Sequence, residues 1–302
     1  MKRKSISSIV RALAVTMALC GTTFAQDVEI KSSSGRVNTT SRITYHDGPV
    51  MIGASDIYVI WYGCWDETCG NLGNPNTQMI LTDFLSSIGG SPYFQINAMY
   101  GSPFGAPSGA LFWAGQVVDH YSHGMELTKE QIAGIVQDQI EDLKLPLDPA
   151  GIYLVLASAD VSSVSTGFCT SELVHHGTGM AFDESGFRYA FVGNPNRCPS
   201  VAAPQFFSGG TLLPTPNADL PADAMASSIA QVLSGVVTNP VGGGWFDRYG
   251  LEAAQKCVGQ FGPTYLAPNG AIANIRLGQR HWLIQQNWVN GKRGHCAMNS
   301  SL

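Results

Sequence analysis

The chain has 302 residues, of which only 13% are charged, and its formal net charge is −5. This mild acidity provides no basic patch for nucleic acid, so we expect no nucleic-acid partner. The low charge, together with 34 Gly and 16 Pro, excludes a highly charged disordered chain and suits a loop-rich globular protein.

The N-terminus has the pattern of a secretory signal peptide. Basic residues between positions 2 and 11 precede an apolar stretch over residues 12–19, and small residues stand at Thr23 and Ala25. This pattern predicts a signal peptide over residues 1–25, cleaved after Ala25, and hence a secreted, extracellular protein. The apolar stretch is too short to cross a bilayer and no later segment has a transmembrane pattern, so we expect no membrane span.

The first half of the mature chain alternates strand and helix signals. We expect a flexible polar arm over residues 26–42 and a folded domain over residues 43–302. β-Branched and aromatic residues predict a strand over residues 57–62. Asn76 can cap a helix that runs to about residue 87, and a further strand is predicted over residues 111–120.

The alternation continues through the second half. The capping box Thr128–Gln131 opens a helix that extends to Leu143, and an apolar run then predicts a strand buried on both faces. The order predicts a single α/β domain with a central mixed sheet, helices packed on it, and disulfides to stabilise it. These later elements are a strand over 152–157, a strand over 188–193, a long loop over 195–221, a helix over 221–238, a short helix over 251–258, and strands and turns in the last forty residues.

Reactive side chains follow the central strand. Cys169, Glu172, His175 and His176 come after residues 152–157, and strand ends are where α/β proteins place their sites. A disulfide-anchored loop with two surface histidines is the simpler interpretation. In a strand, adjacent histidines point to opposite faces, so His175 and His176 would not chelate one ion. The chain has no H-E-x-x-H sequence either, and we expect no metal and no cofactor.

Other kinds of site have weaker support. The chain lacks the G-x-S-x-G elbow of many serine hydrolases, and Gly242–Gly244 follows a helix instead of opening one, which does not suit phosphate. Aromatic side chains can stack on sugar rings, although most such residues lie in the core. Two groups of aromatic residues could have this role: Trp61, Tyr62 and Trp65, and Trp245, Phe246 and Tyr249.

The cysteine count indicates disulfides. Six cysteines remain after the predicted cleavage, an even number that is typical of an exported, disulfide-bonded chain. No C-x-x-C spacing occurs, which argues against a thiolate metal site, and Cys64 and Cys69 could close one local loop. The six are Cys64, Cys69, Cys169, Cys198, Cys257 and Cys296.

A colinear series of short motifs resembles the phosphate-induced protein/EXORDIUM family. The series covers nearly all of the mature chain in one order, which makes the resemblance specific. It comprises Tyr45–Val50, Ile60–Gly63, Asp83–Ile88, Gly151–Leu156, Ser158–Val161, Gly167–Cys169, His176–Gly177, Tyr189–Asn194, Cys198–Pro199, Pro216–Asn217, Asp219, Thr238–Pro240, Leu251–Ala254 and Cys257.

The resemblance implies a secreted or cell-wall-associated protein. Members in plants are linked to growth under brassinosteroid, carbon or phosphate control, with no settled biochemical activity. Some members carry His-Glu-x-x-Glu in the helix before Thr-Asn-Pro, which is similar to half of a zinc peptidase motif. The matching positions here are Gln231, Val232 and Gly235, which supply neither a good zinc ligand nor a general base. The chain therefore resembles the branch without that motif.

The resemblance also implies site residues and disulfides. Plant members often carry further cysteines where Leu173 and Ala202 stand here, which leaves Cys169 to pair with Cys198 and Cys257 with Cys296. Four polar residues fall at family positions and could be remnants of one polar site: His46, His176, Asp219 and Glu252.

We therefore expect a non-catalytic secreted or cell-surface protein with a role in growth or in nutrient and stress responses. Its expected partner is an extracellular glycan or protein of unknown identity. One alternative is a hydrolase related to zinc peptidases, with a degenerate or rearranged site. The other is a carbohydrate-binding protein that uses Trp61, Trp65 or Trp245.

Overall fold

A mixed sheet forms the centre of the computed structural model, which describes residues 27–28, 42–164, 167–169, 173–291 and 294–300. Strands β9, β6, β3 and β4 are parallel, and β8 is antiparallel to β9. In spatial order the strands are β1 (Asp27–Val28), β8 (Val174–Met180), β9 (Gly186–Val192), β6 (Gly151–Ala157), β3 (Gly53–Tyr62) and β4 (Pro107–Asp119).

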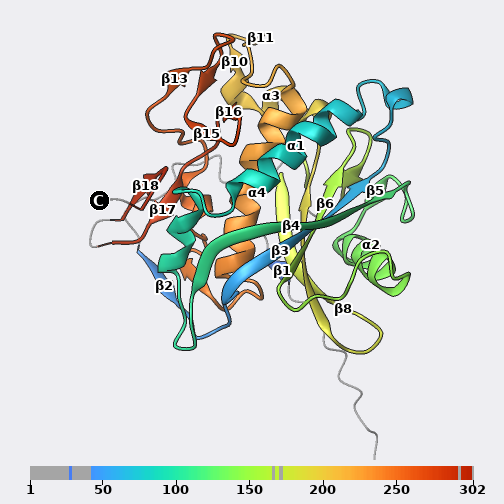
Figure 1. Cartoon of the computed structure of the whole chain (residues 1–302), viewed down its shortest axis with the longest axis vertical. Helices are drawn as coiled ribbons and strands as arrows, with labels where there is room; N and C mark the ends of the chain where they lie inside the picture. The colour runs from blue at the N-terminus through green and yellow to red at the C-terminus, as the bar shows by residue number, and fades with distance from the viewer. Residues whose placement is uncertain (1–26, 29–41, 165–166, 170–172, 292–293, 301–302) are drawn as a thin grey trace, which may run out of the picture.

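Helices cover both faces of this sheet (Figure 1). Alternate residues of β3 and β6 point to opposite faces, because side chains alternate along a strand. Ile57, Val59 and Trp61 join the core with α1 and α4, whereas Tyr58 and Ile60 join the core with α2. The helices are α1 (Pro75–Ile88), α2 (Lys129–Glu141), the single-turn α3 (Pro199–Ala202) and α4 (Leu220–Thr238).

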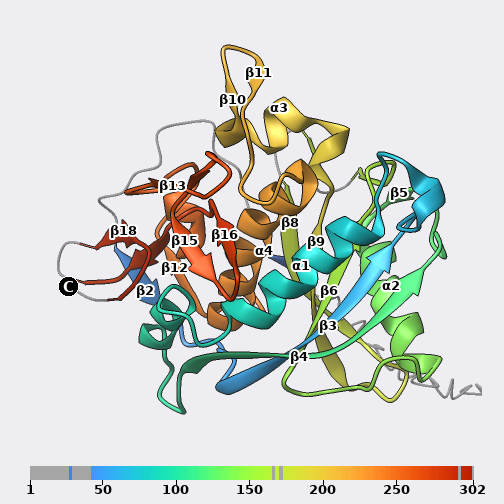
Figure 2. The same cartoon turned by 45° about the horizontal axis from the view of Figure 1, so that its top comes forward.

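Helix α4 is enclosed on nearly every side. It packs on β8 and β9, against α1, and beneath the C-terminal hairpins, as Figure 2 shows. Trp282 from that C-terminal region stacks edge-on against Phe84 of α1 at a centroid distance of 4.8 Å. Among the described residues α4 alone is long and apolar enough to cross a membrane, but 78% of the relevant window is buried within the fold. Its apolar character is therefore that of a core helix.

Short elements complete the chain. The two-stranded pairs are β2 (Ile43–Tyr45) with β12 (Trp245–Asp247), β5 (Glu126–Leu127) with β7 (Ser162–Ser163), β10 (Phe207–Ser208) with β11 (Thr211–Leu212), β13 (Tyr265–Leu266) with β14 (Ile272–Ala273), β15 (Ile275–Leu277) with β16 (Arg280–Trp282), and β17 (Asn287–Val289) with β18 (His295–Ala297). Five 3₁₀ helices span Glu67–Cys69, Phe94–Met99, Pro195–Arg197, Pro204–Phe206 and Ala254–Cys257 among the described residues.

The predicted α/β class and mixed sheet are confirmed. The capping box is also confirmed, since the Thr128 side chain accepts from Gln131 N and the Gln131 side chain accepts from Thr128 N. Helix α1 instead begins two residues earlier than predicted, because Asn74, and not Asn76, caps it and Pro75 occupies its first position. The short helix predicted over 251–258 is only a 3₁₀ turn at Ala254–Cys257.

The three predicted disulfides are present. Cys64–Cys69 closes a loop after β3, Cys169–Cys198 ties the segment before β8 to the segment after β9, and Cys257–Cys296 ties a 3₁₀ turn to β18. Two of the three therefore hold loops at the carboxyl edge of the parallel strands. The predicted signal peptide lies outside the described residues, as does the predicted arm apart from residue 42 and β1, which pairs with β8.

Candidate functional site

Of the four predicted site residues, two meet and two lie elsewhere. His176 of β8 and Glu252 form a buried pair beside the C-terminal half of α4. Asp219 caps the opposite end of α4, which spans 19 residues, or about 28 Å of helix. His46 lies after β2 with its ring exposed and stacked on Phe246 at 3.7 Å. The four candidate residues therefore do not gather in one polar cluster.

Asp219 has a structural role for a local reason. Its side chain accepts hydrogen bonds from Ala222 N at 2.9 Å and from Thr77 Oγ1 at 2.8 Å. The first bond satisfies an amide that the first turn of a helix leaves without a partner, and the second ties α4 to α1. The sequence carried this signal, since Asp followed by Leu-Pro is a typical helix start.

The buried pair is held by several polar contacts. His176 Nε2 lies 3.1 and 3.2 Å from the two carboxyl oxygens of Glu252, and both side chains are at most 2% exposed. Asn239, which ends α4, donates from Nδ2 to Glu252 Oε1 at 2.7 Å. Its Oδ1 accepts from Gly244 N at 2.7 Å. Both oxygens of the carboxyl group therefore have a partner, as a buried acid requires, whereas His176 Nδ1 has none among the described residues.

Gly235 makes room for this pair. A Cβ at position 235 would lie 2.5 Å from Glu252 Oε2 and 2.8 Å from His176 Nε2. The pair thus sits against the helix backbone in space that any side chain at Gly235 would need. This position matches the last Glu of the His-Glu-x-x-Glu pattern that the resemblance implies for some relatives, so the pair stands where that side chain would project.

His175 points to the other face of β8, as predicted. Its ring lies 5.6 Å from Phe191 and 5.7 Å from Tyr189, in the layer covered by α2. Both ring nitrogens lack a hydrogen-bond partner among the described residues. Burial, with smaller contributions from Lys129 and His176, lowers the pKa of His175 to about 3. It is a neutral core residue and shares no ligand with His176.

A cavity lies beside the buried pair, between β8 and α4. Val174 is two residues before His176 on the same face of β8, and Gln231 is one turn before Gly235 on α4. The cavity has a volume of about 160 Å³ and no charged side chain among its described lining residues. Its polar lining is Gln205, Ser227, Ser228, Gln231 and Gln285, and its apolar wall includes Leu173, Val174, Val258 and Phe261.

The tryptophans singled out from the sequence do not form a sugar platform. Trp61 and Trp65 are 1% and 2% exposed, with their rings 5.1 Å apart, and their indole nitrogens donate to Gln116 Oε1 and to Tyr62 O. Trp245 is half-buried and donates to Gly101 O. The use of Trp61 and Trp65 for stacking is therefore wrong, because β3 and its following loop turn both into the core.

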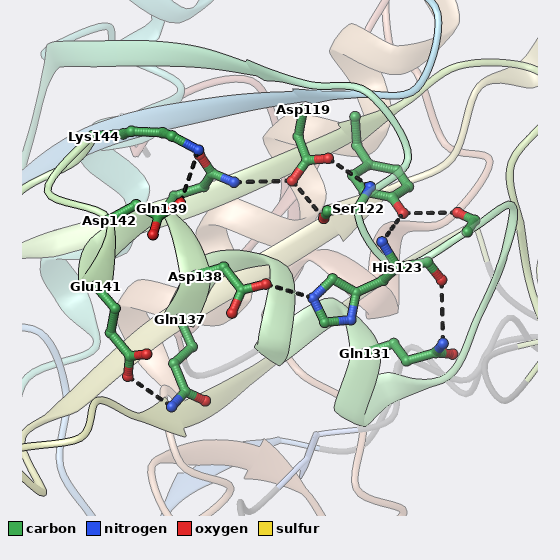
Figure 3. Close-up of polar contacts among 12 residues, drawn as sticks. Asp119, Ser122, His123, Gln131, Gln137, Asp138, Gln139, Glu141, Asp142 and Lys144 are labelled. Atoms are coloured by element: carbon green, nitrogen blue, oxygen red, sulfur yellow. Dashed lines mark hydrogen bonds and ion pairs between the residues drawn. The ribbon is translucent and has the colours of Figure 1, made fainter.

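A polar cluster between β4 and α2, shown in Figure 3, was not anticipated from the sequence. Asp119 accepts from Ser122 Oγ at 2.7 Å and from Gln139 Nε2 at 2.9 Å, while His123 Nε2 lies 2.8 Å from Asp138. The set contains Ser, His and Asp, but Ser122 bonds Asp119 and not His123. It fastens the turn after β4 to α2 and does not assemble a nucleophile with its base.

Metal-ligating groups are similarly occupied. Among the described residues one set of possible ligand atoms gathers within 4.8 Å, at Cys64, Asp66 and Cys69. Both cysteines there are joined in a disulfide, so neither offers a thiolate. The Asp66 carboxyl group accepts from Thr68 N at 2.8 Å as the cap of a 3₁₀ turn. This set does not fit a metal site.

Comparison with known proteins gives a consistent result. Residues 43–275 match the model of the phosphate-induced protein 1 conserved region. Protein EXORDIUM-like 5 of Arabidopsis thaliana is 32% identical over 276 residues, covering 83% of this chain and 73% of that protein. Protein EXORDIUM-like 3 of the same plant is 28% identical, with coverages of 82% and 80%. Protein PHOSPHATE-INDUCED 1 of Nicotiana tabacum is 27% identical, with 72% of each chain covered. No solved structure matches the chain.

Proposed function

The chain belongs to the phosphate-induced protein 1 family, and from this premise we propose that it is a secreted, non-catalytic protein that acts at the cell surface or in the extracellular matrix by binding a partner. We extend the proposal to a role in growth or in nutrient and stress responses. The name of the tobacco relative, which refers to induction by phosphate, supports a nutrient-linked role.

The burial of the His176–Glu252 pair carries the non-catalytic part of the proposal. A general base must reach the proton that it removes, and a nucleophile must face the substrate. Both side chains of the pair are at most 2% exposed, and Asn239 occupies the remaining side of the carboxyl group. The neighbouring cavity is lined by uncharged groups among the described residues, which suits binding more than acid–base chemistry.

Two features of the chain support secretion. The basic and apolar N-terminal pattern ends at Ala25 with small residues at the cleavage positions. Three disulfides also fit an oxidising compartment, because cytosolic thiols are kept reduced. N-terminal sequencing of protein recovered from the medium should begin at or near Gln26. Recovery of the full-length chain in the cytosol alone would contradict secretion.

The non-catalytic proposal is tested by turnover and metal analysis together. Protein purified without chelator is assayed against a peptide library and against neutral and acidic polysaccharides, in parallel with His176→Ala. We expect no product above the blank from either protein and no stoichiometric zinc. One equivalent of zinc, with cleavage that His176→Ala abolishes, would instead identify a hydrolase with a rearranged site.

A further inference from the structure

The cavity between β8 and α4 holds hydrogen-bonding groups that the protein does not use. The side chains of Gln205, Ser228 and Gln231 have no hydrogen-bond partner among the described residues, and all three line the cavity. Gln285 is 5% exposed and donates from Nε2 to Ala254 O, which leaves its Oε1 without a described donor. Amides and hydroxyls without partners in the protein favour a ligand that both donates and accepts hydrogen bonds.

The floor of the cavity is formed by buried, hydrogen-bonded side chains. Ser227 is 7% exposed, and its Oγ accepts from Gln285 N at 2.9 Å. Its hydroxyl proton is therefore free to bond a ligand. The bond between Ser227 and Gln285 joins α4 to the segment before β17, so both residues are held in place before any ligand arrives.

The opposite wall is apolar. Phe261, Val258 and Leu173 are partly buried and line the cavity with Val174. Such a wall can pack against the apolar face of a sugar ring, whereas the glutamine side chains can hydrogen-bond to the hydroxyl groups around the edge of the ring. The volume of about 160 Å³ suits one six-membered ring, since an engineered cavity of about 150 Å³ in another protein holds benzene.

The lining excludes other classes of ligand by charge and polarity. No Lys, Arg or His is among the described lining residues, so a phosphate or carboxylate group would enter without a counter-charge. A purely apolar ligand would cover Gln205 and Gln231 without replacing their bonds to water, which is costly. A neutral, polyhydroxylated ring with one apolar face satisfies both walls.

We infer that this cavity binds one pyranose ring at the end of a neutral glycan, with Gln231, Ser227, Ser228 and Gln285 as its hydrogen-bonding groups and Phe261 as its apolar wall. The inference rests on the proposed binding function and specifies the class of its partner. It places the carbohydrate contact at α4 and not at Trp61 or Trp65. The His176–Glu252 pair packs against α4 at Gly235, one turn from Gln231, and does not line the cavity.

The test is saturation-transfer NMR with the full mature protein and four disaccharides: cellobiose, maltose, laminaribiose and β-1,4-galactobiose. We expect saturable binding of at least one, with a Kd on the order of 1 mM or tighter. Gln231→Leu should weaken it by roughly 3- to 10-fold through loss of one or two hydrogen bonds. Ser228→Phe, which fills the cavity, should abolish it. Gln78→Leu on α1 is the matched control, because Gln78 is also a half-buried helix glutamine but lines a different hollow.

Each outcome decides a separate point. Absence of saturable transfer from all four disaccharides, or binding that Ser228→Phe leaves intact, overturns the inference while the non-catalytic proposal stands. Preferential binding of inorganic phosphate or digalacturonate, used as anionic probes, overturns the neutral class. Cleavage of a bound disaccharide would keep the cavity assignment and overturn the non-catalytic proposal. Thermal melting of each variant alongside Gln78→Leu shows that the fold is retained.

Discussion

Gly235→Ala provides the most direct test of how tightly the His176–Glu252 pair is packed against α4. In an exposed helix interior, replacing Gly with Ala stabilises by about 1 kcal/mol, because Ala loses less backbone entropy. Here the new Cβ would lie 2.5 Å from Glu252 Oε2 and 2.8 Å from His176 Nε2, whereas carbon–oxygen contacts normally exceed 3 Å. Either the helix or the buried carboxyl group must therefore move.

The cost follows from what holds Glu252 in place. Moving the carboxyl group stretches its bonds to His176 and to Asn239, which is 2.7 Å away, in a site closed to bulk water because both side chains of the pair are at most 2% exposed. Overpacking a filled interior costs about 1–3 kcal/mol, and loss of a buried hydrogen bond costs about 1–3 kcal/mol. After subtracting the helix-propensity gain of about 1 kcal/mol, we expect Gly235→Ala to lower the free energy of unfolding by about 1–5 kcal/mol.

The matched control is Gly134→Ala in the middle of α2. Its Cβ would meet His123 Cε1 at 2.8 Å, but this imidazole is on a partly exposed side chain that can turn away. We expect the control to change stability by no more than about 1 kcal/mol in either direction. Urea unfolding followed by tryptophan fluorescence and circular dichroism measures both variants against the parent.

A double variant separates crowding from a general effect on the helix. In a Glu252→Ala background the nearer obstructing atom is gone and the His176 ring has room to move away, so adding Gly235→Ala should cost less than about 1 kcal/mol. If Gly235→Ala is as stable as the parent, or if its cost is unchanged when Glu252 is removed, the pair is not packed against α4 as described.

Three further predictions use other parts of the fold. Burial lowers the pKa of His175 to about 3, so between about pH 6.5 and 3 the unfolded chain binds a proton that the folded chain does not. The free energy of unfolding should therefore fall as the pH drops through this window, by up to about 1.4 kcal/mol per pH unit. His175→Leu should flatten this fall, as measured by urea midpoints at several pH values. Asp219→Ala should lower the unfolding free energy by about 1–3 kcal/mol, whereas Asp219→Asn, which can still cap α4, should cost clearly less; equal losses would contradict the capping role. Replacing both cysteines of Cys257–Cys296 with Ser removes a cross-link between residues 39 positions apart and should lower the free energy of unfolding by about 4 kcal/mol. The same change at Cys64–Cys69, where the separation is 5, should lower it by about 2 kcal/mol. Calorimetry that reverses this order would refute the loop-entropy estimate.

Local patterns in the sequence were sufficient for much of the fold. The apolar run over residues 152–157 forms β6, which is buried along its whole length. A central parallel strand is covered by helices on both faces, so its sequence is continuously apolar and can be recognised without tertiary information. The capping box at Thr128 works through residues three apart, so its prediction needs no knowledge of distant contacts. The disulfide pairing required the family resemblance, since 15 pairings of six cysteines are possible.

Strand β8 was missed because its sequence has little strand character of its own. Val174–Met180 includes two glycines and two histidines, and it is held in the sheet by its register with β9. Pairing with a distant strand outweighs such weak local preference. The adjacency of His175 and His176 nevertheless predicted opposite faces, because alternation follows from backbone geometry alone.

The candidate site was decided by tertiary structure. The sequence supplied His176 and Glu252 as polar residues, but they are 76 positions apart, and nothing local indicated that they pair while His46 and Asp219 do not. The cavity likewise combines residues from β8, α3, α4 and the segment after Cys257, each of which contributes a few atoms. Sequence determines which side chains are available and how each short segment is shaped. Only the packing of α4 on β8 determines which of those side chains share a volume, because that packing depends on the burial of apolar surface from the entire chain.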